Sequence, residues 1–445
     1  GFLQVLYFNI TGYKLNTELV KSLVQIKKAA AIANYKAGLL NENIEKAIIE
    51  ACDKILRGNL QDQFILDPIQ GGAGTSANMN ANEVIANEAI QILGGKKGDY
   101  SIVHPNDHVN MGQSTNDVFP TAGKITALKL LLKAIEQLKK LDITLEIKAK
   151  DFNNIIKMGR TQLQDAVPIR LGQEFKAYSS VIKRDISRLE ATKKELEVLN
   201  LGGTAIGTGI NADNRYMNTV VPILSDIIGI QLEQADDLID ATQNLDGFVS
   251  VSGAIKTCAV NLSKMANDLR LMSSGPRTGL EEINLPAKQN GSSIMPGKVN
   301  PVIPEVMTQV AFNIIGNDVT ITMAAEAGQL ELNAFEPVIF FNLFESIETL
   351  TNGVKTFTEN CISGITANTN RCKKLVDNSV GIVTAITPYV GYEKAASIAK
   401  SAIKTGKPVK EIILQNGILK ESELDRILDP ISMTEPKELK KYEFA

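Results

Sequence analysis

The chain has 445 residues, with 47 Lys and Arg against 50 Asp and Glu, so its formal net charge is −3. This near-neutral balance excludes a generally basic nucleic-acid-binding protein, although it leaves room for a local basic pocket. A content of 44% hydrophobic and 22% charged residues is typical of a soluble globular protein. The length predicts two or three domains, because it exceeds what one hydrophobic core supports.

Histidine is scarce, since His104 and His108 are the only two in the sequence. Histidine is the usual acid–base side chain near neutral pH, so a dispersed histidine triad or a three-histidine metal site is excluded. Two histidines four residues apart could share a helix face, but Pro105 interrupts a helix there. We therefore expect a loop with ordinary polar histidines. We expect no metal and no organic cofactor, and leave activation by a divalent cation open.

The cysteines and apolar segments bear on location. Four cysteines are scattered without a C-x-x-C pair, which predicts buried thiols in a reducing compartment. The longest apolar run, 338–341, is far too short to span a bilayer. The N-terminus has no signal pattern. We therefore expect a cytoplasmic protein with neither membrane nor nucleic acid as a partner. Because residue 1 is Gly rather than Met, natural sequence could precede it.

Helical periodicity dominates the chain in order. Shorter helices are predicted at 15–37 and 41–56, the second with Asn41 as its cap. Long apolar stripes follow at 125–138, 175–196 and 237–272, and after Pro304 and Pro337. Five long helices with short connections predict an all-α fold around an extended bundle. Helices near or above thirty residues exceed the usual length, so self-association is expected to bury their stripes.

Composition changes near Asn116 and Asn370. We predict an N-terminal domain at 1–116, a central helix-bundle domain at 117–370 and a small C-terminal domain at 371–445. Beyond Asn370 the pattern becomes short helices punctuated by Pro and Gly.

Five segments interrupt the helical pattern with small polar residues: 74–80, 113–117, 159–165, 202–211 and 291–301. Several precede a helix, and helix N-termini offer free N–H groups to a carboxylate or phosphate. Taken singly, each is more simply a helix cap. Nucleotide motifs are rejected, because Lys298 is followed by Val299 rather than Ser or Thr, and the glycines around Gly207 lack a third member.

The most informative segment is 291–301. Gly291 and Gly297 permit unusual backbone angles, as a closing lid requires. Ser292 and Ser293 are candidate nucleophiles or bases, and Lys298 adds a cation. The simpler alternative is a solvated, flexible loop with a solvent-facing lysine.

The sequence GSSIMPGKVNP at 291–301 resembles the signature of the aspartase/fumarase superfamily. The blocks at 74–80, 104–110 and 113–117 resemble other blocks of that family, in the same order. The resemblance extends from about Phe8 nearly to the C-terminus, whereas residues 1–7 depart from the pattern. It implies an all-α, three-domain fold whose central bundle forms a twenty-helix homotetramer core. It also implies active sites shared by three subunits.

Within the superfamily, segments 172–175, 300–306 and 323–333 resemble the aspartase branch. The implied reaction is reversible elimination of ammonia from L-aspartate to give fumarate, through an aci-carboxylate intermediate. The alternatives are a fumarate hydratase and a catalytically silent structural protein of the same fold.

Gln162 bears on this choice. Fumarases carry His there, paired with a Glu that corresponds to Glu305. Expelling hydroxide needs a proton donor, whereas an ammonium leaving group already holds its proton. Glutamine cannot act as an acid but can hydrogen-bond an amine. Gln162 therefore favours an ammonia-lyase.

The resemblance also implies roles for ten residues. Ser292 would be the base that takes the proton beside the β-carboxylate. As an alkoxide it would need N–H donors and a cation, which the glycine loop and Lys298 would supply. The substrate-binding set would be Thr75, Ser114 and Thr115 for the β-carboxylate; Thr161, Lys298 and Asn300 for the α-carboxylate; Asn116 and Gln162 for the amino group; and Ser293 through its backbone N–H.

Overall fold

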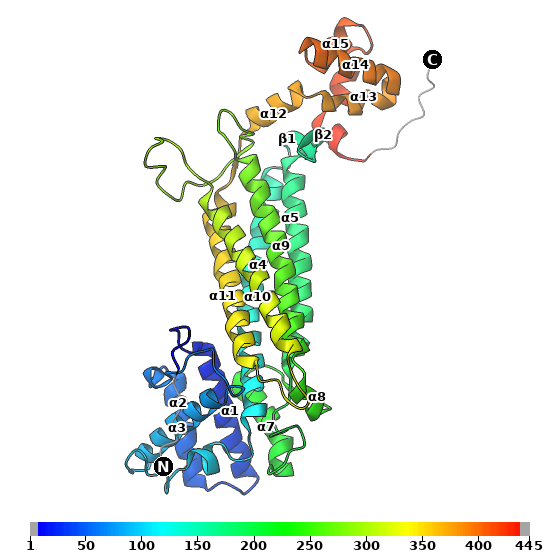
Figure 1. Cartoon of the computed structure of the whole chain (residues 1–445). Coiled ribbons are helices and arrows are strands. Elements are labelled where there is room, and N and C mark those ends of the chain that lie inside the picture. The colour runs from blue at the N-terminus through cyan, green and yellow to red at the C-terminus, as the bar shows by residue number, and fades with distance from the viewer. Residues whose placement is uncertain (1–7, 437–445) are drawn as a thin grey trace. The chain divides into compact units, whose positions relative to one another are not determined.

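The computed structural model describes residues 8–436, so the unusual residues 1–7 lie outside the described part. Figure 1 shows the helices and strands in chain order, from blue at the N-terminus to red at the C-terminus. The chain divides into two compact units. The first comprises the residues up to Glu136, Asp185–Ala259 and Val310–Asn352. The second comprises Gln137–Arg184, Val260–Gln309 and the residues from Gly353 onward. The predicted boundaries near Asn116 and Asn370 stay predictions.

The N-terminal helices belong to the first unit. They are α1 (Thr17–Lys36), α2 (Glu42–Leu56), α3 (Thr75–Ile92) and α7 (Asn214–Ile228), and α1 packs against α2 and α7. The two predicted helices at 15–37 and 41–56 are confirmed as α1 and α2. Asn41 caps α2 as predicted, because its side chain accepts a hydrogen bond from the Asn43 N–H.

Five long helices are confirmed: α4 (Thr115–Asp151), α5 (Leu171–Ala191), α9 (Asp246–Met272), α10 (Val302–Glu326) and α11 (Glu336–Asn360). Each unit contains part of every one of them. Only α4, with 37 residues, exceeds thirty. The single helix expected from 237 to 272 is wrong, because Asn244 adopts an extended conformation (φ −107°, ψ 139°). That residue separates α8 (Leu238–Gln243) from α9.

The other elements are short. The helices are α6 (Lys193–Glu197), α12 (Thr369–Asn378), α13 (Val383–Val390), α14 (Tyr392–Thr405), α15 (Val409–Gln415), α16 (Glu421–Ile427) and α17 (Pro430–Thr434). The strands are β1 (Ile156–Thr161), β2 (Gln164–Arg170), β3 (Val198–Leu199), β4 (Glu233–Gln234), β5 (Ile283–Asn284) and β6 (Thr366–Ala367). They form three two-stranded pairs, β1–β2, β3–β4 and β5–β6. Among the described residues, no helix is long and apolar enough to cross a membrane.

Aromatic packing between long helices forms the core of the first unit. The Phe340 ring of α11 lies 5.1 Å from the rings of both Phe119 and Phe248. Gly123 of α4 permits this approach, because a Cβ at that position would lie 2.0 Å from the Phe340 ring. A side chain at 123 would therefore force the two helices apart.

The second unit has its own core. Met158 of β1 is fully buried in a cluster with residues of the C-terminal helices, including Val376, Ile386, Ile413 and Leu424. Strand β1 is therefore anchored by apolar packing, and it pairs antiparallel with β2. The register shifts between Met158 and Arg160, where Gly159 allows the backbone to approach the Val167 carbonyl.

An ion cluster between α4 and α5 leads to a prediction about acid stability. Glu146 Oε1 lies 2.5 Å from the Nζ atoms of both Lys176 and Lys183. These bonds lower the pKa of Glu146 to about 2. The folded-state pKa is thus below the unfolded value of about 4.3. The stabilisation is complete above that value and is lost as the pH falls toward 2. The free energy of unfolding of the wild type therefore decreases over this pH range. We expect Glu146→Gln to reduce that decrease by about 1 kcal/mol.

Urea unfolding at several pH values between 2 and 6 measures this change. Glu83→Gln is the control, because burial raises the pKa of Glu83. The Glu83 carboxyl binds its proton more tightly in the folded state. Its removal should therefore increase the loss of unfolding free energy as the pH falls. If the unfolding free energy depended on pH equally in the two variants, the stabilising role given to Glu146 would be wrong.

Candidate active site

The N-terminus of α4 carries three of the predicted residues. Ser114 caps the helix, since its Oγ accepts the Asn116 N–H at 3.2 Å. Thr115 is buried, and its Oγ1 accepts a hydrogen bond from Asn78 Nδ2 at 3.1 Å. Asn116 Nδ2 donates to the Ala205 carbonyl at 2.7 Å. The structure therefore places Ser114, Thr115 and Asn116 at the N-terminal end of a helix, and the positive end of the helix dipole favours an anion.

Asp117 holds this first turn of α4 through hydrogen bonds to backbone N–H groups. It is fully buried, and its Oδ1 accepts the Ser114 N–H at 2.9 Å. Its Oδ2 accepts the N–H groups of Gly202 and Thr204 at 2.9 and 3.1 Å. Burial raises the pKa of Asp117 to about 6. The segment 202–211 is thus tied to the helix terminus that bears Ser114.

Thr75 lies at the start of α3, in the same unit. The segment 74–80 was expected to be a loop, and this is wrong, because Thr75 begins an 18-residue helix. Gly74 precedes it with φ +86°, and a Cβ there would lie 2.3 Å from the Phe119 ring. Thr75 is exposed, and its Oγ1 donates to the Gly72 carbonyl at 2.8 Å. Asn78, one turn along α3, provides the bond to Thr115.

Sequence reasoning missed a buried lysine behind this polar cluster. Lys27 of α1 is fully buried, and its Nζ donates to Asn110 Oδ1 at 2.8 Å and Gln113 Oε1 at 2.9 Å. Asn110 Oδ1 also accepts from Asn78 Nδ2 at 3.2 Å. Burial lowers the pKa of Lys27 to about 7. The signal was present, because Lys27 occupies the centre of an apolar helix stripe.

Thr161 and Gln162 lie on a hairpin in the second unit. Segment 159–165 was expected to be a loop, but it is the end of β1 with its turn into β2. Gln162 and Leu163 form the two-residue turn with φ values of +55° and +62°. This turn type normally uses Asn or Gly, so two larger side chains here store strain. The strained turn leaves Gln162 exposed at the tip.

The segment 291–301, called the serine loop below, is confirmed as an irregular segment, and it belongs to the second unit. Ser292 is half-buried, and its Oγ accepts the Ile294 N–H at 3.3 Å. Its own N–H donates to the Lys298 carbonyl at 3.3 Å, which closes the loop on itself. Ser293, Lys298 and Asn300 are exposed. The loop thus supplies one of the N–H donors that a basic Ser292 would need.

Two cavities adjoin predicted residues of the second unit. One, of about 450 Å³, is lined by Lys298 and Asn300 together with Arg270 and Glu305. Another, of about 400 Å³, is lined by Gln162 and by charged residues at the base of the hairpin. The first unit holds an aromatic-lined cavity of about 400 Å³ around Phe340, which none of the ten predicted residues lines.

The histidines hold each other in place. The segment at 104–108 was expected to be a loop, but Pro105–Val109 forms one π-helical turn, because proline is tolerated at a first helical position. His108 Nδ1 accepts the His104 N–H at 2.8 Å. His104 Nδ1 accepts the N–H groups of Asn106 and Asp107. Within residues 8–436, no group of three His, Cys, Asp or Glu is arranged to hold a metal ion.

The predicted residues therefore form two groups. Thr75, Ser114, Thr115 and Asn116 belong to the first unit, while Thr161, Gln162, Ser292, Ser293, Lys298 and Asn300 belong to the second. Their common role in one site stays a prediction.

Comparison with known proteins supplies the family. Residues 7–316 match a family described as lyase. The chain belongs to this lyase family. Residues 382–435 match a second family, described as fumarase C C-terminus. The resemblance to the aspartase/fumarase superfamily is thereby confirmed.

Individual proteins are similar to this chain over nearly its whole length. It is 57% identical to aspartate ammonia-lyase of Bacillus subtilis (strain 168), with 96% of this chain and 90% of that protein covered. A solved Brucella melitensis structure, described as fumarate lyase:delta crystallin bound to cobalt, has a TM-score of 0.94 and 50% identity, covering 96% of this chain and 94% of that one. The class II fumarase of Schistosoma mansoni has a TM-score of 0.92 and 35% identity, covering 96% and 93%. These likenesses confirm the all-α helical-bundle fold.

Proposed function

We propose that the protein is an L-aspartate ammonia-lyase, which converts L-aspartate reversibly to fumarate and ammonia. The observation that carries the proposal is its 57% identity, over 96% of its length, to an aspartate ammonia-lyase. The intact serine loop at 291–301 supports it independently, because it offers Ser292 with an N–H donor on its Oγ.

The proposed mechanism is an elimination with Ser292 as the base. The ionised Oγ takes the proton from the carbon beside the β-carboxylate, and the electron pair of that C–H bond moves onto the carboxylate as a dianionic aci-form. The pair then returns to form the C=C bond, while the C–N bond breaks and its electrons leave with ammonia. No acid is needed, because the nitrogen leaves with protons that it already carries.

Charge stabilisation is the main task of the other residues. The extra negative charge develops on the β-carboxylate, which we assign to Thr75, Ser114 and Thr115. The start of α4 supports this assignment, because the positive end of the helix dipole and the hydroxyl groups of Ser114 and Thr115 lie there. Lys298, with Thr161 and Asn300, would hold the α-carboxylate, and Asn116 and Gln162 the amino group. Ser293 would contribute its backbone N–H.

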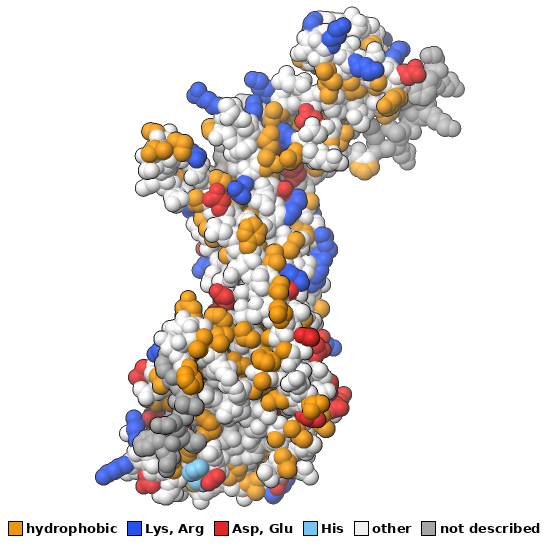
Figure 2. Space-filling view, in the orientation of Figure 1, with side chains coloured by type: hydrophobic (Ala, Val, Ile, Leu, Met, Phe, Trp, Pro, Cys, Tyr) orange, Lys and Arg blue, Asp and Glu red, His pale blue; other side chains and the backbone are white. Residues whose placement is uncertain are grey.

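We further propose that four copies of the chain assemble and that three of them contribute to each site. The exposed apolar side chains of α10 support this, since Phe312, Val319 and Met323 are 64%, 57% and 65% exposed. Figure 2 shows patches of apolar side chains at the surface over the long helices. Water-facing apolar stripes of this kind mark a surface that another subunit covers. A second copy is the natural occupant, because a closed homo-oligomer buries the same stripe on every chain.

Two expectations complete the proposal. The elimination needs no resident metal or organic cofactor, because the leaving group carries its proton and fixed polar groups face the developing charge. Activation by a divalent cation remains compatible with it. The proposed location is the cytoplasm, supported by Cys52, Cys258, Cys361 and Cys372, which are all free and buried.

Separate incubations with L-aspartate and L-malate test the function. We expect L-aspartate to be turned over at least about 100-fold faster, since a site built for one polar group discriminates strongly against another. Fumarate absorbance in the ultraviolet measures both reactions. The second candidate is a fumarase, favoured by the match at 382–435. Faster turnover of L-malate would establish it instead, and no turnover of either acid would favour a catalytically silent protein.

A further inference from the structure

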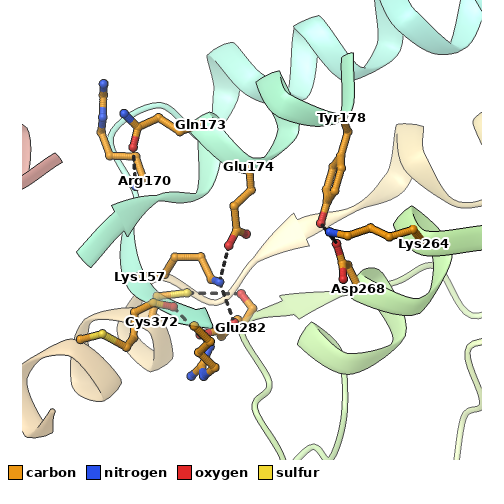
Figure 3. Close-up of polar contacts among 11 residues, drawn as sticks. Lys157, Arg170, Gln173, Glu174, Tyr178, Lys264, Asp268, Glu282 and Cys372 are labelled. Atoms are coloured by element: carbon orange, nitrogen blue, oxygen red, sulfur yellow. Dashed lines mark hydrogen bonds and ion pairs between the residues drawn. The ribbon is translucent and has the colours of Figure 1, made fainter. Parts of the chain in front are cut away.

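A buried ion cluster lies at the base of the β1–β2 hairpin in the second unit (Figure 3). The side chain of Glu282 is 0% exposed and that of Lys157 is 3% exposed. Lys157 Nζ lies 3.2 Å from Glu282 Oε2 and 2.8 Å from Glu174 Oε1. Arg160 contacts the other oxygen, Glu282 Oε1, at 2.8 Å. Glu282 therefore binds two cations of strand β1 at once.

The backbone of Glu282 is itself fixed. Its N–H donates to the Met272 carbonyl at the end of α9, at 2.9 Å. Its carbonyl accepts the Asn368 N–H at 2.9 Å and lies 3.5 Å from Cys372 Sγ. The next two residues form β5, which pairs with β6. Residues 285–290 then lead directly into the loop that bears Ser292.

Stability alone does not account for this arrangement. Removing two carboxylates and two cations from water is costly, so a buried cluster of this kind is weak evidence for a stabilising role. The strand that Glu282 binds ends in the strained turn at Gln162 and Leu163, both with positive φ. Such strain persists only when the surroundings over-determine the backbone. Lys157 and Arg160 lie in the strand that leads into that turn.

We propose that Glu282 is a positioning residue for the hairpin tip. By binding Lys157 and Arg160, it fixes Thr161 and Gln162 relative to the segment that leads to the serine loop. Glu282 acts through β1 and does not contact the substrate. This inference rests on the proposed function, because it takes Gln162 as the group that binds the substrate amine.

A double-mutant cycle on kcat/KM for L-aspartate tests the proposal. Glu282→Gln removes the charge that binds both cations but keeps the size of the side chain. We expect it to lower kcat/KM by about 100-fold in the wild-type background, since a small misplacement of a binding group has that effect. In a Gln162→Ala background the same change is expected to cost about tenfold or less, because the group being positioned is already absent. An equal loss in both backgrounds would overturn the proposal.

Two further variants separate positioning from general damage. Arg160→Gln removes the ion pair with Glu282 at a side chain that is 14% exposed. It replaces Glu282→Gln in the same double-mutant cycle if that variant does not fold. Asp318→Asn is the matched control, because Asp318 is 8% exposed and paired with Lys256 at 2.6 Å in the first unit. Asp318→Asn should change kcat/KM by the same factor with and without Gln162. If Asp318 were coupled to Gln162 as strongly as Glu282 is, the specific role of Glu282 would be refuted. A wild-type protein inactive on L-aspartate refutes the proposed function, whereas an active one with additive effects refutes only this inference.

Discussion

Ser292→Ala is expected to lower kcat for fumarate formation from L-aspartate by about 1,000-fold, within the range found when a positioned base is removed. The substitution deletes the atom that takes the proton, while the loop keeps its shape through the bond from the Ser292 N–H to the Lys298 carbonyl. The assembly and the thermal midpoint should therefore stay close to those of the wild type. Initial rates from ultraviolet absorbance measure the loss.

The neighbouring residue provides the control for this variant. Ser293→Ala removes the same hydroxyl group one position along the loop, and the proposed role of Ser293 needs only its backbone N–H. We expect a loss of less than about tenfold, the size of one peripheral hydrogen bond. Near-normal turnover in Ser292→Ala, or an equal loss in both variants, would exclude Ser292 as the base.

Phe312→Glu is expected to dissociate the assembly and abolish activity at low protein concentration. Phe312 is 64% exposed in the single chain, so a carboxylate there costs the isolated subunit little. In the proposed interface it would be buried without a partner, at a cost of at least about 3 kcal/mol per subunit. That cost weakens association by about 100-fold for each subunit that carries the substitution. Light scattering coupled to size exclusion measures the assembly, and activity at the same concentrations measures the dependence of the site on it.

Ile403→Glu is the matched control, because Ile403 of α14 is 71% exposed and lies outside the α10 stripe. It introduces the same charge at an equally exposed apolar position, and we expect it to keep both assembly and activity. A fully active monomer of Phe312→Glu would refute the shared site. An intact tetramer of that variant would refute the assignment of this face as the interface.

Much of the helical architecture follows from local patterns in the sequence. The stripe of Leu128, Leu131 and Ile135 predicts α4 because apolar residues at helical spacing must share one buried face. Asn41 is predictable as a cap because its side chain satisfies a free N–H whatever the distant packing. The loop at 291–301 is predictable because its glycines and prolines disfavour a helix.

Other features depend on neighbours that the local pattern does not identify. The start of α3 is rich in Ala and Asn and has no apolar periodicity, yet it is helical because Asn78 and Asn82 bond to Asn110 across the fold. The hairpin at 156–170 was missed because Gln162 and Leu163 are poor residues for a tight turn. Its ion partner, Glu282, is more than a hundred residues away in sequence.

The sequence by itself determined the five long helices, the Asn41 cap and, through the serine loop and Gln162, the chemistry to expect, because each of these depends on residues close together in the chain. The tertiary structure alone decided which charges are buried. Lys27 faces Asn110, and Glu282 faces Lys157 and Arg160. A buried charge is tolerable only with a partner, and folding brings that partner from elsewhere in the chain.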